Sequence, residues 1–110
     1  MTANRDEVVV YWRAGCGYCA LLQLGLRRAR LPFRLVDIWK DQQAAAFVRS
    51  VANGNETVPT VTVAGVAMVA PMPGQVLAAV AEHAPQLLPP ERPAPWWRRL
   101  RPARDARARR

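Results

Sequence analysis

The feature that most constrains the fold is an uninterrupted apolar run near the start of the chain, followed by a helical pattern and a second short run. Val8–Trp12 is β-branched and aromatic without polar alternation, which is typical of a strand covered on both faces. Apolar residues recur at helical spacing over residues 19–30, and residues 33–37 again have strand composition. This order predicts a parallel βαβ unit with a right-handed crossover and a central first strand.

The next part of the chain predicts a helix, a hairpin and a last helix. Asp41 is expected to cap a second helix, which ends at Asn53-Gly54-Asn55, residues that tolerate left-handed backbone. Thr60–Val63 and Val66–Val69 are separated by two residues and predict an antiparallel hairpin. Pro73 is expected to open the last helix. The predicted order is βαβαββα, an α/β fold with a central mixed four-stranded sheet flanked by helices.

The composition changes near the end of the chain, where Pro and Arg dominate. The formal net charge is +8, of which residues 1–88 carry +2 and residues 89–110 carry +6. We expect a folded domain at residues 1–85 and a disordered tail at residues 86–110. The segment Trp96-Trp97-Arg98-Arg99-Leu100-Arg101 could touch a membrane surface or nucleic acid. A solubilising end without a partner is the favoured alternative.

The compartment can also be predicted from the sequence. The first seven residues carry charges of both signs, and three prolines interrupt the Ala- and Val-rich residues 58–81. Neither segment resembles a signal peptide or a membrane span. We therefore expect a cytoplasmic protein, in which two cysteines three residues apart are not the structural disulfide of a secreted scaffold.

The cysteines form the sequence Cys16-Gly17-Tyr18-Cys19 at the predicted turn from the first strand into the first helix. The N-terminus of a helix offers free N–H groups and the positive end of its dipole, which favour a thiolate. Cys16 is therefore the predicted nucleophile, held by the amide of Tyr18 or Cys19. Cys19, one turn further on and partly shielded, is the predicted resolving thiol.

Five neighbouring residues are candidates for substrate binding. Arg13 could support the thiolate or receive a carboxylate of a thiol substrate, or it could be a solvated loop arginine. Tyr18 could pack against substrate and donate a hydrogen bond. In the segment Thr57, Val58 and Pro59, a cis proline would expose the Val58 backbone to an extended substrate, whereas a trans proline would simply start a strand.

Other roles for the cysteines are less consistent with the sequence. A closed zinc site needs four ligands, and one chain offers only Cys16, Cys19 and His83, so we expect no metal. A dimer could still pool cysteines around zinc or an iron–sulfur cluster. Inert core cysteines would need an apolar setting, which Gly15 and Gly17 do not favour.

With these residues in place, the chain resembles the glutaredoxin family of the thioredoxin fold over residues 7–84. Within that family it is most similar to the mycoredoxins of bacteria that use mycothiol. The segments that carry the resemblance are Cys16-Gly17-Tyr18-Cys19, Val36-Asp37-Ile38, Ala44-Ala45-Ala46-Phe47-Val48, Asn53-Gly54-Asn55 and Thr57-Val58-Pro59-Thr60.

The resemblance implies an oxidoreductase that reduces mixed disulfides between proteins and a low-molecular-weight thiol. Cys16 would attack, Cys19 or a second thiol would resolve, and Pro59 would be cis. Family members that use glutathione typically carry Gly-Gly and an acidic residue near the last helix, whereas this chain has Pro71-Met72-Pro73-Gly74-Gln75. Mycothiol is therefore the expected co-substrate, with no bound cofactor. Gly15 also replaces the bulky residue that often precedes the first cysteine.

Two alternative functions fit the same motif. A redoxin of this kind could take electrons directly from thioredoxin reductase rather than from a free thiol. A dimer could instead bind or transfer an iron–sulfur cluster held by two Cys16 thiolates and two external thiols. We expect a monomer whose partners are the small thiol and proteins that carry mixed disulfides.

Overall fold

A mixed four-stranded sheet forms the centre of the molecule. The computed structural model describes residues 7–89, and the strand order is β2-β1-β3-β4. β1 (Val8–Trp12) pairs in parallel with β2 (Arg34–Asp37) and antiparallel with β3 (Thr60–Val63), which in turn pairs antiparallel with β4 (Val66–Val69). The predicted mixed sheet, with the first strand inside it, is confirmed.

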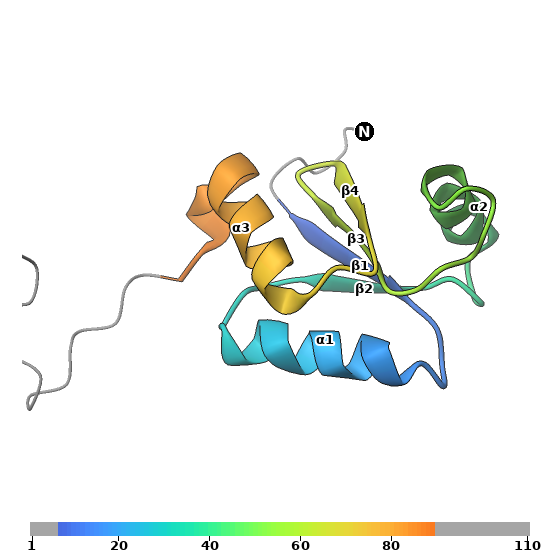
Figure 1. Cartoon of the computed structure of the whole chain (residues 1–110), viewed down its shortest axis with the longest axis horizontal. Coiled ribbons are helices and arrows are strands. Elements are labelled where there is room, and N and C mark those ends of the chain that lie inside the picture. Colours follow the sequence, from blue (N-terminus) through green and yellow to red (C-terminus); the bar gives the residue numbers. More distant parts are fainter. Residues whose placement is uncertain (1–6, 90–110) are drawn as a thin grey trace, which may run out of the picture.

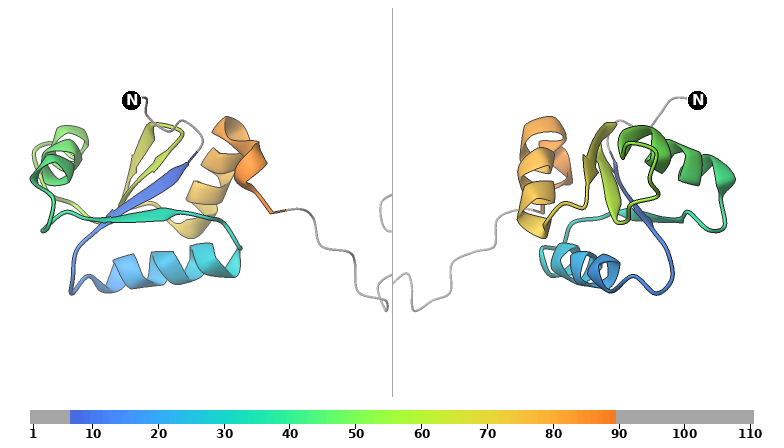
Figure 2. Two further views of the ribbon diagram at one scale, coloured as in Figure 1. Left: turned by 180° about the vertical axis from the view of Figure 1, so that it is seen from behind. Right: turned by 45° about the vertical axis from the view of Figure 1, so that its right-hand side comes forward.

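Helices cover both faces of this sheet (Figure 1). α1 (Gly17–Arg28) and α3 (Pro73–His83) pack on one face, and α2 (Gln42–Val51) packs on the other. Side chains of β1 alternate between the two layers, with Val10 on the first and Tyr11 on the second. This alternation explains why β1 is apolar throughout. The same helices lie on the two faces of the sheet when the molecule is seen from behind and in an oblique view (Figure 2).

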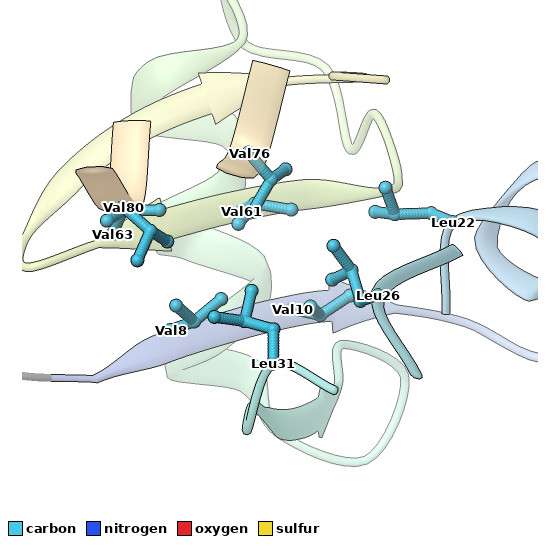
Figure 3. Packing of buried hydrophobic residues seen from close by; sticks show 9 residues of the cluster. All are labelled: Val8, Val10, Leu22, Leu26, Leu31, Val61, Val63, Val76 and Val80. Atoms are coloured by element: carbon cyan, nitrogen blue, oxygen red, sulfur yellow. The ribbon is translucent and has the colours of Figure 1, made fainter. Parts of the chain in front are cut away.

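The larger core lies between the sheet and the pair α1 and α3 (Figure 3). Its fully buried members are aliphatic side chains from β1, β3, α1, α3 and the connection after α1: Val8, Val10, Leu22, Leu26, Leu31, Val61, Val63, Val76 and Val80. Because these side chains fix α1 against the sheet, they also fix the turn that carries Cys16.

The local signals for α2 are confirmed. The carboxylate of Asp41 accepts hydrogen bonds from the amides of Gln43 and Ala44 at 3.0 and 3.1 Å, so it caps the helix as predicted. Beyond its last residue the backbone of Asn53 has a φ of 59°, the left-handed conformation that ends many helices.

Packing against the larger core continues past residue 85, the end of the folded domain in the sequence-based prediction. A short 3-10 helix, Pro85–Leu87, follows α3, and Leu87 and Leu88 pack, partly buried, against the larger core. Most of the predicted tail, including the predicted contacts at residues 96–101, lies outside the described residues. The division at residues 85 and 86 therefore stays a prediction. None of the helices within residues 7–89 combines the length and apolar character that a membrane span requires.

Candidate active site

Cys16 occupies the N-cap position of α1, immediately after the turn that leaves β1. Gly15 enters this turn with a φ of 83°, a conformation that other residues rarely adopt. The amide N–H of Cys19 donates a hydrogen bond to the Cys16 Sγ at 3.1 Å. The sequence predicts that the amide of Tyr18 or Cys19 donates to this sulfur, and the donor is the amide of Cys19. The donated N–H and the N-terminal end of α1 therefore both lie at the sulfur that the sequence analysis predicts to be the nucleophile.

Cys19 has a different environment from Cys16. Its side chain is 1% exposed, whereas Cys16 is half-buried, and both cysteines are free thiols. Burial, reinforced by the hydrogen bond to Cys16, raises the pKa of the Cys19 thiol to about 12. Near neutral pH, Cys19 is therefore protonated and sheltered, and Cys16 is the sulfur that an incoming disulfide can reach.

The segment Thr57–Pro59 lies against the start of α1. The Val58–Pro59 peptide bond is cis, as the family resemblance implies. The Cys16 thiol lies 3.9 Å from the carbonyl oxygen of Val58, although 42 residues separate them in the chain. The carbonyl of Thr57 accepts a hydrogen bond from the Thr60 hydroxyl at 2.8 Å, so Thr57 helps to shape this loop.

Tyr18 connects the cysteine motif to the loop before α3. Its hydroxyl donates a hydrogen bond to the carbonyl oxygen of Pro71 at 3.0 Å, and its side chain is 37% exposed. The hydroxyl is thus engaged within the protein, and the ring is the part of Tyr18 that remains available to a substrate.

Arg13 lies on the other side of Cys16. The two residues line an open depression of about 430 Å³, together with Trp12, Gly15 and residues of α1. The Arg13 guanidinium stacks over the ring of Trp39 at 5.4 Å. Trp39 was not among the predicted site residues. It could have been found, because Arg13 and Trp39 follow two adjacent parallel strands and must emerge at the same edge of the sheet.

The start of α3 departs from the glutathione-binding pattern expected of other family members. The amide N–H of Met72 donates to the side-chain carbonyl of Gln75 at 2.7 Å, so this backbone amide already has a partner. Within residues 7–89, no three His, Cys, Asp or Glu side chains gather as a group of metal ligands.

Comparison with known proteins agrees with this geometry. The sequence model of the family described as Glutaredoxin matches residues 8–68, which include both cysteines and Pro59. The chain belongs to the glutaredoxin family. A Mycobacterium tuberculosis relative, named as a candidate glutaredoxin, is 44% identical over 54 residues, which cover 49% of this chain and 64% of that protein. This glutaredoxin thus spans under two thirds of that relative's length.

Mycoredoxin 1 of Corynebacterium glutamicum is a second relative of this glutaredoxin. It is 38% identical over 56 residues, covering 51% of this chain and 68% of mycoredoxin 1. Solved structures show the shared fold: the glutaredoxin-like NrdH-redoxin of Escherichia coli has a TM-score of 0.58 at 17% identity, covering 81% of this chain and 99% of its own. A buckwheat glutaredoxin in complex with glutathione also has a TM-score of 0.58, at 18% identity, covering 76% of this chain and 81% of its own.

Proposed function

We propose that this protein is a thiol–disulfide oxidoreductase that reduces mixed disulfides between proteins and a low-molecular-weight thiol, with Cys16 as the nucleophile. The observation that carries the proposal is the 3.1 Å hydrogen bond from the Cys19 amide to the half-buried Cys16 sulfur, with Cys19 buried behind it. The Cys16 sulfur is thereby accessible as the attacking group, and the buried Cys19 sulfur can react only in a later step.

In the first step the Cys16 thiolate attacks the small-thiol sulfur of the mixed disulfide. A Cys16–small-thiol disulfide forms, and the protein sulfur leaves as a thiolate that takes a proton from water. A second small thiol then attacks that small-thiol sulfur, which releases the oxidised small-thiol dimer and regenerates the Cys16 thiolate. Alternatively, Cys19 loses its proton and attacks Cys16, which expels the small thiol and leaves a Cys16–Cys19 disulfide. In the first route the second small thiol attacks as its thiolate, and its proton passes to water. In the second route Cys16 and Cys19 supply the two electrons, so two small thiols must then reduce the Cys16–Cys19 disulfide and leave as the oxidised small-thiol dimer.

The high pKa of Cys19 favours the route that uses a second small thiol. Burial is the largest cause of that pKa and comes from the packing of Cys19 in α1, whereas the smaller contributions of Cys16 would be lost in a mixed disulfide at Cys16. Only a small fraction of Cys19 would then be ionised near neutral pH, so an external thiolate has the advantage.

Mycothiol is the small thiol that we propose. A relative bears the name mycoredoxin 1, and the segment from Pro71 to Gln75 lacks the glycine pair and acidic residue of glutathione-using family members. Gln75 also occupies the Met72 amide that an anionic ligand could have used. Arg13 and the exposed ring of Tyr18 are the proposed contacts for the thiol on either side of Cys16. The Val58 backbone beside Pro59 is the proposed edge for pairing with an extended client.

We further propose a cytoplasmic monomer without a bound cofactor, since free thiols persist in a reducing compartment.

The test compares three electron donors with one mixed-disulfide substrate. We expect turnover with mycothiol and an NADPH-coupled system that regenerates it, much less with glutathione, and none when Cys16→Ser replaces the wild-type chain. Turnover with thioredoxin reductase and no small thiol would instead support the directly reduced redoxin. Absence of turnover with every donor, from folded protein, would contradict both assignments.

A further inference from the structure

Trp39, the residue that follows β2 and its turn, is an aromatic side chain outside the core. It is 64% exposed, and neither buried cluster of the described part of the chain includes it. Exposed apolar residues are common on protein surfaces, so exposure alone does not give Trp39 a role. Its contact does: the guanidinium carbon of Arg13 lies 5.4 Å from the centre of the Trp39 ring, within the range of a cation–π interaction.

The backbone fixes Trp39 at the same edge of the sheet as Arg13. β1 and β2 are parallel with Trp12 opposite Asp37, and the Ile38 amide donates to the Trp12 carbonyl at 2.9 Å. The Asp37 carboxylate then accepts a hydrogen bond from the Trp39 amide at 2.9 Å. Both connections leave the sheet at this edge (Figure 1). The ring that Arg13 meets is therefore carried on a hydrogen-bonded turn.

Within residues 7–89, Arg13 has an aromatic partner and no carboxylate within ion-pair distance. The two acidic residues on either side of Trp39 have other partners, since Asp37 accepts from the Trp39 amide and Asp41 caps α2. In the same part of the chain, the Arg13 guanidinium donates one hydrogen bond, to the Ala14 carbonyl at 3.3 Å. A guanidinium has five N–H donors, so most of them remain for a ligand.

An aromatic partner restrains the guanidinium of Arg13 without neutralising it. A long arginine side chain loses rotamer freedom when it binds a ligand, and a partner that holds it beforehand lowers this cost. A carboxylate would also restrain the side chain, but it would occupy N–H donors and offset the charge. A stacked ring covers the face of the guanidinium and leaves its N–H edge free. The restrained guanidinium lines the same depression as Cys16.

We propose that Trp39 is a positioning residue, whose ring holds the Arg13 guanidinium at the depression beside Cys16 so that its N–H donors meet acceptor oxygens of the bound small thiol. This inference rests on the proposed function, because the small thiol is the ligand that brings those oxygens to Cys16. Trp39 acts on the reaction through Arg13 and does not contact the reacting sulfurs.

Direct contact between Trp39 and the ligand is the alternative that a test must separate. The Trp39 ring also borders a second open depression, of about 610 Å³, which Gln42, Gln43 and Arg49 of α2 line as well. A ligand in that depression would touch Trp39 whether or not Arg13 is present. The two roles therefore differ in whether the effect of Trp39 depends on Arg13.

The first test is a double-mutant cycle on the KM for mycothiol, with one mixed-disulfide substrate. Trp39→Leu removes the ring but keeps an apolar side chain, and it should raise KM about two- to fivefold, the effect of an exposed cation–π contact. The change is expected in KM rather than in kcat. Trp39→Phe keeps a ring and should recover most of the loss. In an Arg13→Ala background, Trp39→Leu should have no further effect.

Leu35→Ala, at an exposed apolar residue of β2, is the control for the cycle and should leave KM as in the wild type. An equal rise in KM from Trp39→Leu with and without Arg13 would overturn the inference and assign Trp39 a direct contact. The absence of any rise in the wild-type background would overturn it as well.

An NMR measurement on the ligand-free protein separates failure of this inference from failure of the proposed function. The Arg13 Nε–H signal, assigned by its loss in Arg13→Lys, should carry a ring-current shift that disappears in Trp39→Leu and persists in Trp39→Phe. That shift without turnover by the wild type with any donor would retain the positioning of Arg13 and contradict the function. Turnover with the same Arg13 signal in wild type and Trp39→Leu would overturn the positioning and leave the function standing.

Discussion

At the scale of single residues, the chemistry depends on two sulfurs that differ in exposure and protonation. Because Cys19 is 1% exposed and its pKa is about 12, it contributes little nucleophile near neutral pH. We expect Cys19→Ser to retain at least a tenth of the wild-type turnover of a mixed disulfide, and Cys16→Ser to retain none. A coupled assay measures both. Complete loss in a folded Cys19→Ser protein would contradict the route that uses a second small thiol.

The raised pKa of Cys19 also makes stability depend on pH. In an unfolded chain the pKa of this thiol has its ordinary value of 9.0, whereas in the folded chain the pKa is about 12. The unfolded state therefore gives up its proton first, and the stabilisation present below about pH 9 is lost as the pH rises towards about 12. Urea midpoints of wild type and Cys19→Ala should show a steeper alkaline decline for the wild type. Parallel declines would show that Cys19 titrates normally in the fold.

We expect the positively charged guanidinium of Arg13 to contact the bound small thiol. Arg13→Ala should raise the KM for the thiol by several-fold, since an exposed charge-assisted contact is worth about 1 kcal/mol and 1.4 kcal/mol is a factor of ten. Arg27→Ala is a matched control, because Arg27 also stacks on an aromatic ring, Phe33, at 5.5 Å but does not line the depression at Cys16. An equal KM change in both variants would assign the effect to overall charge.

At the scale of secondary structure, local signals predict the elements well and the site only in part. The hairpin strands Thr60–Val63 and Val66–Val69 match the prediction, because strand composition and the two-residue turn Ala64-Gly65 are local signals. The sequence predicts helix α1 over residues 19–30, whereas the helix spans Gly17–Arg28. The start was missed because the capping group is the Cys16 sulfur and not one of the usual capping side chains. The stacking of Arg13 on Trp39 depends on strand pairing, which a local pattern does not contain.

The contact between α1 and α3 is a close approach that only glycine permits. A Cβ at Gly25 would lie 2.6 and 2.9 Å from the ring carbons of Pro73. Gly25→Ala should therefore lower the free energy of unfolding by about 1 kcal/mol, because overpacking of 1–3 kcal/mol exceeds the gain in helix propensity. Gly74→Ala is the control, since no atom lies within 4 Å of its Cβ position. Urea unfolding measures both, and equal stabilities would mean that the helices separate without cost.

At the scale of the whole molecule, the folded body and the basic segment differ in charge and in what covers the core. Residues 1–88 carry +2 of the total charge of +8, so attraction to anionic surfaces is concentrated in residues 89–110. Residues 86–89, which by composition belong to the Pro- and Arg-rich end, nevertheless contribute Leu87 and Leu88 to the larger core. The composition change and the edge of the packed core therefore do not coincide.

This difference predicts where the chain can be shortened. Leu87 and Leu88 are partly buried against the larger core, and removal of two such side chains should cost about 1–3 kcal/mol. A chain that ends at Pro85 should therefore unfold at lower urea than one that ends at Pro89. Leu87→Ala with Leu88→Ala in the full-length chain is the matched control and should reproduce most of that loss. Equal midpoints for the two shortened chains would place the domain boundary at residue 85, as composition alone predicts.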